Sequence, residues 1–400
     1  MKIYIFENNH ISDLNPLSLT RPSFDLRTGP FTFLERTLQM IDVTEVGLIV
    51  RPELEALCRE RYSEFLVNPL EVEAAVWLLG NVLWRAEEIQ TIVQGSSAVY
   101  RMADTVVGAK LSMDEGKKWL ERGGPLKGSI PAEIPSVAMT PYICRYLWNI
   151  LESMPGLIQH DSKNFQLGVI PDRLPDVHFI NQDKLFIGKE SAVSPGAVLD
   201  ATRGPIIIED KVRIEPLTFL EGPVYIGSDS IIKPFAHISN CAIGPGCKIG
   251  GEVANVIVQG FSNKVHYGYL GDSFLGEWIN LGAGTTSSNL KNNYTPVTVQ
   301  AGESTVNTNL LHVGCFIGDH VKTAIGTVLN TGAVLGPGCM VVTPGFPPKT
   351  LRPFTWFVNG KHHVFRWEKF MEMTNIVIER RGKSFSPNEK KVLQDIFIKR

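Results

Sequence analysis

Residues 226–250 read IGSDSIIKPFAHISNCAIGPGCKIG, and this stretch sets the expectation for the fold. Ile226, Ile232 and Ile238 recur at a spacing of six, and glycine directly follows several of the repeated aliphatic residues along the chain. A period of six matches neither the roughly 3.6 residues of an α-helical turn nor the two of a strand. It is typical of a solenoid whose short strands turn a corner every six residues, with the aliphatic side chain inside and a small residue at the corner.

The same spacing recurs between Ile187 and Val341 and predicts a left-handed parallel β-helix of about eight coils. An ordinary β-sandwich is the alternative, but a sandwich has no reason to keep a sixfold register. We place the β-helix at residues 181–348. The repeated residues include Ile187, Val193 and Leu199, then Leu275 and Leu281, then Leu311, Ile317, Thr323, Leu329, Leu335 and Val341.

Two segments depart from the repeat. Residues 289–310 are polar and break the register, so we expect most of them to form a loop extruded from the β-helix, where long insertions are often functional. The repeat also stops after Gly345, and residues 349–400 form a C-terminal extension. Within it, residues 369–381 and 387–400 read as short amphipathic helices, which we expect to cap the open end of the solenoid.

The N-terminal part, residues 1–180, has a different pattern. Short apolar runs at 2–6, 45–50 and 75–79 predict strands, and residues 52–61 and 140–157 predict helices. Strands that alternate with helices favour an α/β domain on a mainly parallel sheet. In such sheets, binding and catalytic groups gather on loops at the carboxyl ends of the strands.

Composition narrows the class of protein. The 400 residues carry a formal net charge of −2, which gives no basic stripe for nucleic-acid binding. The sequence shows neither a signal peptide nor an apolar run long enough to span a membrane. Its six cysteines are scattered and form no Cys-x-x-Cys pair. We therefore expect reduced thiols and a cytoplasmic protein that binds neither nucleic acid nor a membrane.

The most informative chemistry lies in residues 263–289. His266 stands on a rigid coil, and an imidazole with an ordinary pKa near 6.5 can take a proton from an attacking amine. Asn280 and Asn289 could bind sugar hydroxyls or phosphate, or polarise an acyl carbonyl, and Lys264 could meet a phosphate. A lone histidine on a solenoid surface is more often a bystander, so the residues by themselves leave the role of His266 open. We assign no metal ligands.

This segment resembles the acetyltransferase domain of bifunctional glucosamine-1-phosphate acetyltransferase/N-acetylglucosamine-1-phosphate uridyltransferases, the GlmU-like proteins. Their acceptor-site coil reads His-x-x-Tyr-Leu-Gly-Asp, then Gly-x-x-x-Asn-x-Gly-Ala-Gly-Thr, then Asn. An alternative bacterial branch adds motifs that resemble residues 276–278, 289–294 and 380–382. The residues that match the acceptor-site coil are His266, Tyr269, Leu270, Gly271, Asp272, Gly276, Asn280, Gly282, Ala283, Gly284, Thr285 and Asn289.

The resemblance implies roles for these residues. His266 would be the general base, and Tyr269, Asn280 and Asn289 would bind the sugar phosphate. Acetyl-CoA would lie between coils of neighbouring subunits in a homotrimer, around residues 323–343. The better-known branch holds the phosphate with an Arg and a Lys on earlier coils. Here the corresponding positions fall near alanines, and lysines elsewhere are the candidate substitutes; the residues concerned are Ala236, Ala254, Lys264, Lys291 and Lys233.

Residues 14–38 resemble the start of sugar-nucleotide pyrophosphorylases. That family has a Gly-rich loop that wraps the nucleotide phosphates, whereas residues 7–13 contain no glycine. Ser23 replaces an expected lysine, and Asn81 stands where an aspartate would hold Mg²⁺, a substitution that weakens metal binding. Arg21, Arg27 and Asn81 are the candidate nucleotide-binding residues.

The resemblance therefore implies an enzyme of sugar-nucleotide formation of the UDP-N-acetylglucosamine type. The β-helix would acetylate an amino-sugar 1-phosphate, and the N-terminal domain would transfer a nucleotidyl group from UTP or dTTP with Mg²⁺. Two alternatives stay open: an acyltransferase with a degenerate N-terminal domain, and a non-catalytic β-helix scaffold. A zinc hydrolyase of the γ-carbonic-anhydrase kind is disfavoured, because the histidines lack its His-x4-His spacing.

Overall fold

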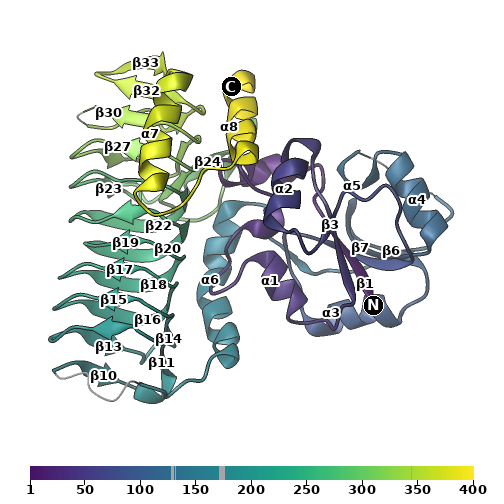
Figure 1. Ribbon diagram of the computed structural model, residues 1–400, viewed down its shortest axis with the longest axis horizontal. Helices are drawn as coiled ribbons and strands as arrows, with labels where there is room; N and C mark the ends of the chain where they lie inside the picture. The colour runs from purple at the N-terminus through teal and green to yellow at the C-terminus, as the bar shows by residue number, and fades with distance from the viewer. Residues whose placement is uncertain (128–129, 131, 171–175, 344) are drawn as a thin grey trace.

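The computed structural model describes residues 1–127, 130, 132–170, 176–343 and 345–400 (Figure 1). The N-terminal part is a seven-stranded sheet in the order β3-β2-β1-β4-β7-β6-β8. Pairs β1–β2, β1–β4, β2–β3 and β6–β8 are parallel, whereas β4–β7 and β6–β7 are antiparallel, which confirms a mainly parallel sheet. The strands are β1 (Lys2–Phe6), β2 (Glu45–Ile49), β3 (Leu66–Val67), β4 (Ala75–Leu79), β6 (Ala98–Met102), β7 (Thr105–Leu111) and β8 (Ser136–Ala138).

Both predicted N-terminal helices exist, but one begins later than predicted. The first is a 3-10 turn followed by α2 (Glu55–Arg61). Residues 142–143, predicted as helix, form β9 (Tyr142–Ile143), which pairs with β5 (Val82–Leu83), and α6 (Leu147–Asp161) starts only after it. Pro141 disfavours a helical backbone in the residue before it, so the chain is extended there. The remaining longer helices are α1 (Phe33–Leu38), α3 (Ala86–Gln94) and α4 (Met113–Glu121).

The second part is a parallel β-helix, as the sixfold spacing predicted. Strands β16 (Phe219–Ile226), β18 (His237–Ile243), β20 (Glu252–Gly260) and β22 (Tyr269–Glu277) pair in parallel, and each strand turns from one face of the prism to the next. Repeat residues stack in register across the coils and are buried, which is why the period holds. One such stack is Ile226, Ile243, Val258, Leu275 and Ile317.

A further face of the prism, which we call the third face, is built from very short parallel strands. It runs along β12 (Ala192–Val193), β15 (Arg213–Ile214), β17 (Ile231–Ile232), β19 (Lys248–Ile249) and β21 (Asn263–Lys264). Beyond the register break it continues with β27 (Lys322–Thr323), β30 (Met340–Val342) and β32 (Thr355–Val358). The outermost coils carry β10 (His178–Ile180) at one end and the antiparallel pair β32–β33 (Lys361–Val364) at the other.

The register break is an insertion, as predicted. The chain leaves the β-helix after β23 (Thr286–Ser287), forms the hairpin β24 (Thr298–Ala301)–β25 (Ser304–Asn307), and rejoins the β-helix at β26 (Cys315–Ile317). On the next coil, β28 (Val328–Leu329) pairs with β23. Val299 and Ala301 of the hairpin are buried in the N-terminal core. Helix α6 packs on β16, β18, β20 and β22 in the same region. The insertion and α6 therefore join the α/β sheet to the side of the β-helix.

The C-terminal helices differ from their predicted role as an end cap. Figure 1 shows α7 (Trp367–Glu379) and α8 (Pro387–Lys399) beside the upper coils, with α8 between the β-helix and α2. Their apolar sides form a small core of Phe354, Phe370 and Leu393. Amphipathic helices pack on an available apolar surface, and here that surface is the flank of the solenoid.

Two further expectations can be compared with the structure. All six cysteines are free and buried, as expected for reduced thiols. In the part of the chain that the structure describes, the helices are too short or too polar to cross a bilayer.

Candidate active site on the β-helix

His266 lies at the corner between β21 and β22. Its side chain is exposed, and among the described residues it has no side-chain hydrogen-bond partner. The corner itself is tightly bound, because the backbone carbonyl of His266 accepts a hydrogen bond from Lys264 Nζ at 2.7 Å. The arrangement gives a rigid backbone with an imidazole free to exchange a proton with a ligand.

Tyr269 and Asn289 lie together one strand further on. Asn289 Nδ2 donates to the Tyr269 hydroxyl at 3.0 Å and to Asp272 Oδ2 at 2.5 Å. Asp272 Oδ1 in turn accepts from Asn255 Nδ2 at 2.6 Å. Burial and the nearby Asp272 carboxylate raise the pKa of Tyr269 to about 12. The hydroxyl therefore keeps its proton and, since it accepts from Asn289, it can donate that proton to a ligand.

Asn280 lies elsewhere, on the third face, where its Oδ1 accepts a hydrogen bond from Asn263 Nδ2 at 3.4 Å. The four residues that the motif assigns to the acceptor site therefore do not all lie on the same face of the prism. Tyr269 and Asn289 face one side of the prism, Asn280 faces another, and His266 stands at the corner between them.

The structure places Lys264, the predicted phosphate contact, inside the coil and away from solvent. The side chain is 2% exposed, and Nζ donates to the carbonyls of Gly250 and His266 at 2.8 and 2.7 Å. Burial lowers the pKa of this lysine to about 8. Lys264 therefore fixes the corner that carries His266. The other candidate substitutes are also engaged: Lys233 pairs with Glu215, and Lys291 donates to the Pro296 carbonyl.

The three nucleotide-binding candidates all have partners within the chain in this structure. Arg21 is 1% exposed and pairs with Asp319 of the β-helix at 2.6 Å. Arg27 is buried and donates to the Gly29 and Pro30 carbonyls and to the backbone of Gln259. The Asn81 amide donates to the Cys144 carbonyl at 3.0 Å. Buried cations need partners, and these find them within the chain.

A carboxylate lies close to the expected position of the phosphate-binding loop. Glu7 directly follows β1, is fully buried, and accepts hydrogen bonds from the backbone of Ser23 and Arg51 and from the Arg51 guanidinium at 2.6 Å. Beside it, a cavity of about 330 Å³ opens at the carboxyl end of β1. Sequence reasoning missed its lining, which includes Asn8, His10, Arg101 and Lys127, although the loop after the first strand is the usual place to look.

The residues at this edge do not fit a magnesium site. Asn81 supplies a neutral amide that is already hydrogen-bonded, and Mg²⁺ prefers carboxylate oxygens. Within the described ranges, no three His, Cys, Asp or Glu side chains gather in a way that could hold a metal ion.

Comparisons with known proteins match parts of this chain. Residues 3–169 match a family model described as a sugar nucleotidyl transferase. A bifunctional protein GlmU from Wigglesworthia glossinidia brevipalpis is 30% identical over 169 residues, which is 42% of this chain and 33% of that protein. A bifunctional sugar-1-phosphate nucleotidylyltransferase/acetyltransferase from Sulfurisphaera tokodaii is 36% identical over 154 residues, covering 35% and 37% of the two chains.

These matches cover only part of each relative, so the activity of the whole relative does not carry over to this chain. The chain spans about a third of the length of the curated relatives that it matches. A solved UDP-N-acetylglucosamine acyltransferase from Francisella novicida aligns with a TM-score of 0.32 and 16% identity, over 55% of this chain and 73% of that one, which is too weak to transfer an activity. The named relatives agree with the transferase class that the sequence predicted. The chain is thus similar to GlmU-type bifunctional proteins, with residues 3–169 that match a sugar nucleotidyl transferase model and a parallel β-helix after them.

Proposed function

We propose that the β-helix transfers an acetyl group from acetyl-CoA to the amine of an amino-sugar 1-phosphate, with His266 as general base. The observation that carries the proposal is the unpaired imidazole of His266 on the coil that also holds the Tyr269–Asn289 pair. The amine attacks the thioester carbonyl, His266 takes the proton that the amine loses, and that proton passes to the leaving thiolate as the amide forms. Tyr269 and Asn289 would orient the sugar.

We also propose that the active unit is a homotrimer, in which neighbouring copies bring Asn280 and the Tyr269–Asn289 pair to one substrate. An apolar row along one corner of the prism supports this. Four large side chains at that corner of different coils are 54 to 79% exposed, and contiguous exposed apolar surface usually marks an interface. The row is Leu217, Phe235, Tyr267 and Ile325. His266 is next to Tyr267, so a second copy on this corner would also complete the site.

Replacing His266 tests the proposed reaction. His266→Ala should lower acetyl transfer to glucosamine 1-phosphate by at least about a hundredfold, the usual size of a general-base effect, at unchanged molar mass in light scattering. His178→Ala is the matched control, because His178 is also an exposed histidine on a β-helix strand, at the far end of the solenoid. Wild-type turnover in the His266 variant would refute the role of this residue.

For the N-terminal domain we propose nucleotidyl transfer to the product, from UTP or dTTP. The family match at residues 3–169 and the cavity after β1 support it, whereas the buried Glu7 carboxylate favours a degenerate domain. An assay of pyrophosphate release decides between an active and a degenerate domain. Each nucleotide is incubated with the chain, an N-acetyl sugar 1-phosphate and Mg²⁺. Release that falls in Arg101→Ala, a cavity variant, supports catalysis there. No release with either nucleotide would leave an acyltransferase with a degenerate N-terminal domain.

A further inference from the structure

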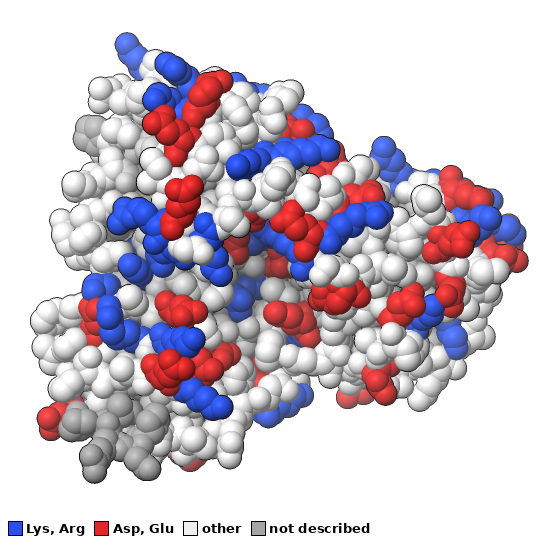
Figure 2. All heavy atoms as spheres, viewed as in Figure 1, with Lys and Arg blue, Asp and Glu red and all other residues white. Residues whose placement is uncertain are grey.

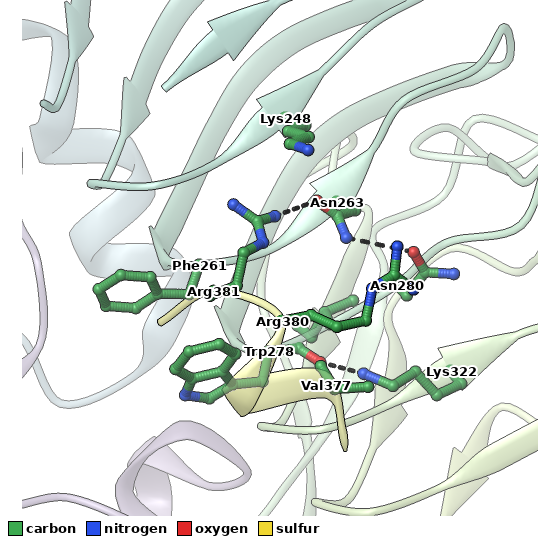
Figure 3. Close-up of a pocket in the computed structure, with 10 residues that line it drawn as sticks. Lys248, Phe261, Asn263, Trp278, Asn280, Lys322, Val377, Arg380 and Arg381 are labelled. Carbon is green, nitrogen blue, oxygen red and sulfur yellow. Dashed lines mark hydrogen bonds between the residues drawn. The ribbon is translucent and has the colours of Figure 1, made fainter. Parts of the chain in front are cut away.

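A second cavity lies on the third face of the β-helix, under the end of α7. Its volume is about 470 Å³, which lies in the range of small-molecule sites. One wall consists of coil residues from β19, β21 and β27, and the other is the C-terminal tail at the point where α7 ends. The lining residues are Lys248, Phe261, Asn263, Trp278, Ile279, Asn280, Lys322, Val377, Arg380 and Arg381 (Figure 3).

Four of these ten residues are cations, and none of the ten is acidic. Figure 3 shows Arg380 and Arg381 extending from the tail, with Lys248 and Lys322 on opposite sides of them. Arg381 donates to Asn263 Oδ1 at 2.7 Å and to the Gly246 carbonyl, so it is held in place. In the described part of the chain, Lys248 and the Arg380 guanidinium have no side-chain partner. Figure 2 shows Lys and Arg atoms gathered on this side of the β-helix.

The cations are close enough to disturb one another. Burial lowers the pKa of Lys248, and the positive charges of Arg381, Lys233, Arg213 and Arg380 lower it further. Burial also lowers the pKa of Lys322 to about 8. Four positive charges around one cavity repel one another, and a bound anion would relieve that repulsion.

The rest of the lining favours an organic anion over a simple ion. Phe261 and Trp278 stack with ring centroids 4.9 Å apart and planes at 9°, and together they form an apolar wall. The amides of Asn263 and Asn280 add polar groups that could meet hydroxyls. Flat apolar surface beside hydrogen-bonding amides and cations suits a sugar ring or a base that carries phosphate.

We propose that this cavity binds the phosphate-bearing part of a transferase substrate, with Arg380 and Lys248 as phosphate contacts and the Phe261–Trp278 wall against the organic part. The proposal rests on the proposed function for the choice of substrate. It would supply the cations that the earlier coils lack at Ala236 and Ala254, from a different part of the chain. It also places the tail in the binding site, since Arg380 follows α7 directly.

Calorimetric titration of the full chain tests the site, with acetyl-CoA and glucosamine 1-phosphate as separate probes. Arg380→Ala and Lys248→Ala should each weaken binding of one probe about tenfold, the value of one charge-assisted phosphate contact. Lys369→Ala is the control with the same charge change, because Lys369 pairs with Glu372 on the exposed side of α7. An unchanged melting temperature in circular dichroism would show that the variants fold.

The affected probe identifies the ligand: weaker binding of acetyl-CoA assigns the donor, and weaker binding of the sugar phosphate assigns the acceptor. The proposal is overturned if neither probe binds the wild-type chain, if both variants bind like wild type, or if Lys369→Ala weakens binding equally. Acetyl transfer measured in parallel separates the two proposals. Probe binding that depends on Arg380, in a chain without acetyl transfer, would overturn the proposed function but keep this site.

Discussion

Asn289 connects two groups of the candidate acceptor site, because its amide donates to both the Tyr269 hydroxyl and the Asp272 carboxylate. In Asn289→Ala, both groups lose this donor. We expect acetyl transfer to fall at least about tenfold and the free energy of unfolding to fall by about 0.5 to 1.5 kcal/mol, the net value of a typical hydrogen bond, since both bonds are only partly buried. Asn292→Ala, an exposed position in the same insertion, is the control. Equal activity in the two variants would contradict the role of Asn289.

The stability of the folded chain should depend on pH through Lys322, and the burial of this lysine fixes the direction of the change. Its pKa of about 8 in the folded chain lies below the ordinary 10.5, so the unfolded state binds more protons between these values. Folding therefore carries the full cost of the charged ammonium below about pH 8, and that cost disappears as the pH rises toward 10.5. The stability of wild type relative to Lys322→Met should rise over this interval in urea denaturation. A difference that stays constant with pH would refute the shift.

The sequence located some site residues and misassigned others, for a physical reason. The resemblance of residues 263–289 to the GlmU-like acceptor-site coil pointed to His266, Tyr269 and Asn289, and the structure places Tyr269 and Asn289 in contact with each other, with His266 at the neighbouring corner. Lys264 and Arg21 were read as phosphate contacts because they are cations in suggestive motifs. Their actual partners, the Gly250 carbonyl and Asp319, depend on packing that no local pattern reveals.

At the scale of elements, the sequence predicted the sixfold repeat of the β-helix and the insertion at residues 289–310. It did not predict where the insertion and the C-terminal helices pack. The buried stack that includes Ile243 and Val258 explains why the sixfold pattern is so readable. Residues 289–310 could be recognised as an insertion because they break that pattern. The hairpin β24–β25 packs on the N-terminal core. Its few, closely spaced apolar residues do not indicate this partner, which only the tertiary contacts reveal.

The hairpin should therefore stabilise the attachment of the N-terminal part. Val299 is 2% exposed within the N-terminal core, and Val299→Ala removes about two buried methylene equivalents. We expect the free energy of unfolding to fall by about 1 to 2 kcal/mol, together with faster proteolysis of the insertion. Glu303→Ala at the exposed hairpin turn should change stability by less than about 0.5 kcal/mol. Equal stability of both variants would mean that the hairpin contributes little to docking.

At the scale of the whole molecule, a buried charge network joins the two folds. Arg21 of the N-terminal part meets Asp319 at 2.6 Å and Glu277 at 3.3 Å, both on the β-helix. Thr20 also donates to Asp319, and Asp319 accepts from the Glu277 backbone at 2.7 Å. Burial would raise the pKa of Asp319, but the Arg21 guanidinium outweighs it and holds that pKa below its ordinary value. The Asp319 carboxylate and the Arg21 guanidinium are therefore both charged, and each needs the other as its partner in the buried site.

Removing Arg21 should uncouple the two parts of the chain. Arg21→Ala leaves Asp319 charged and buried without its main partner, a change that typically costs about 3 to 5 kcal/mol. The interior of the β-helix is a core of its own, separate from the core that the N-terminal part shares with the flank of the solenoid, so we expect calorimetry to show two thermal transitions in place of one. Arg85→Ala breaks an exposed Arg–Glu pair and should cost at most about 1 kcal/mol, with one transition. A single transition at the wild-type temperature in Arg21→Ala would show that α6 and the hairpin hold the parts together unaided. If two transitions appear, acetyl transfer should survive the first, since His266 and Tyr269 belong to the β-helix and Asn289 follows directly after its strand β23.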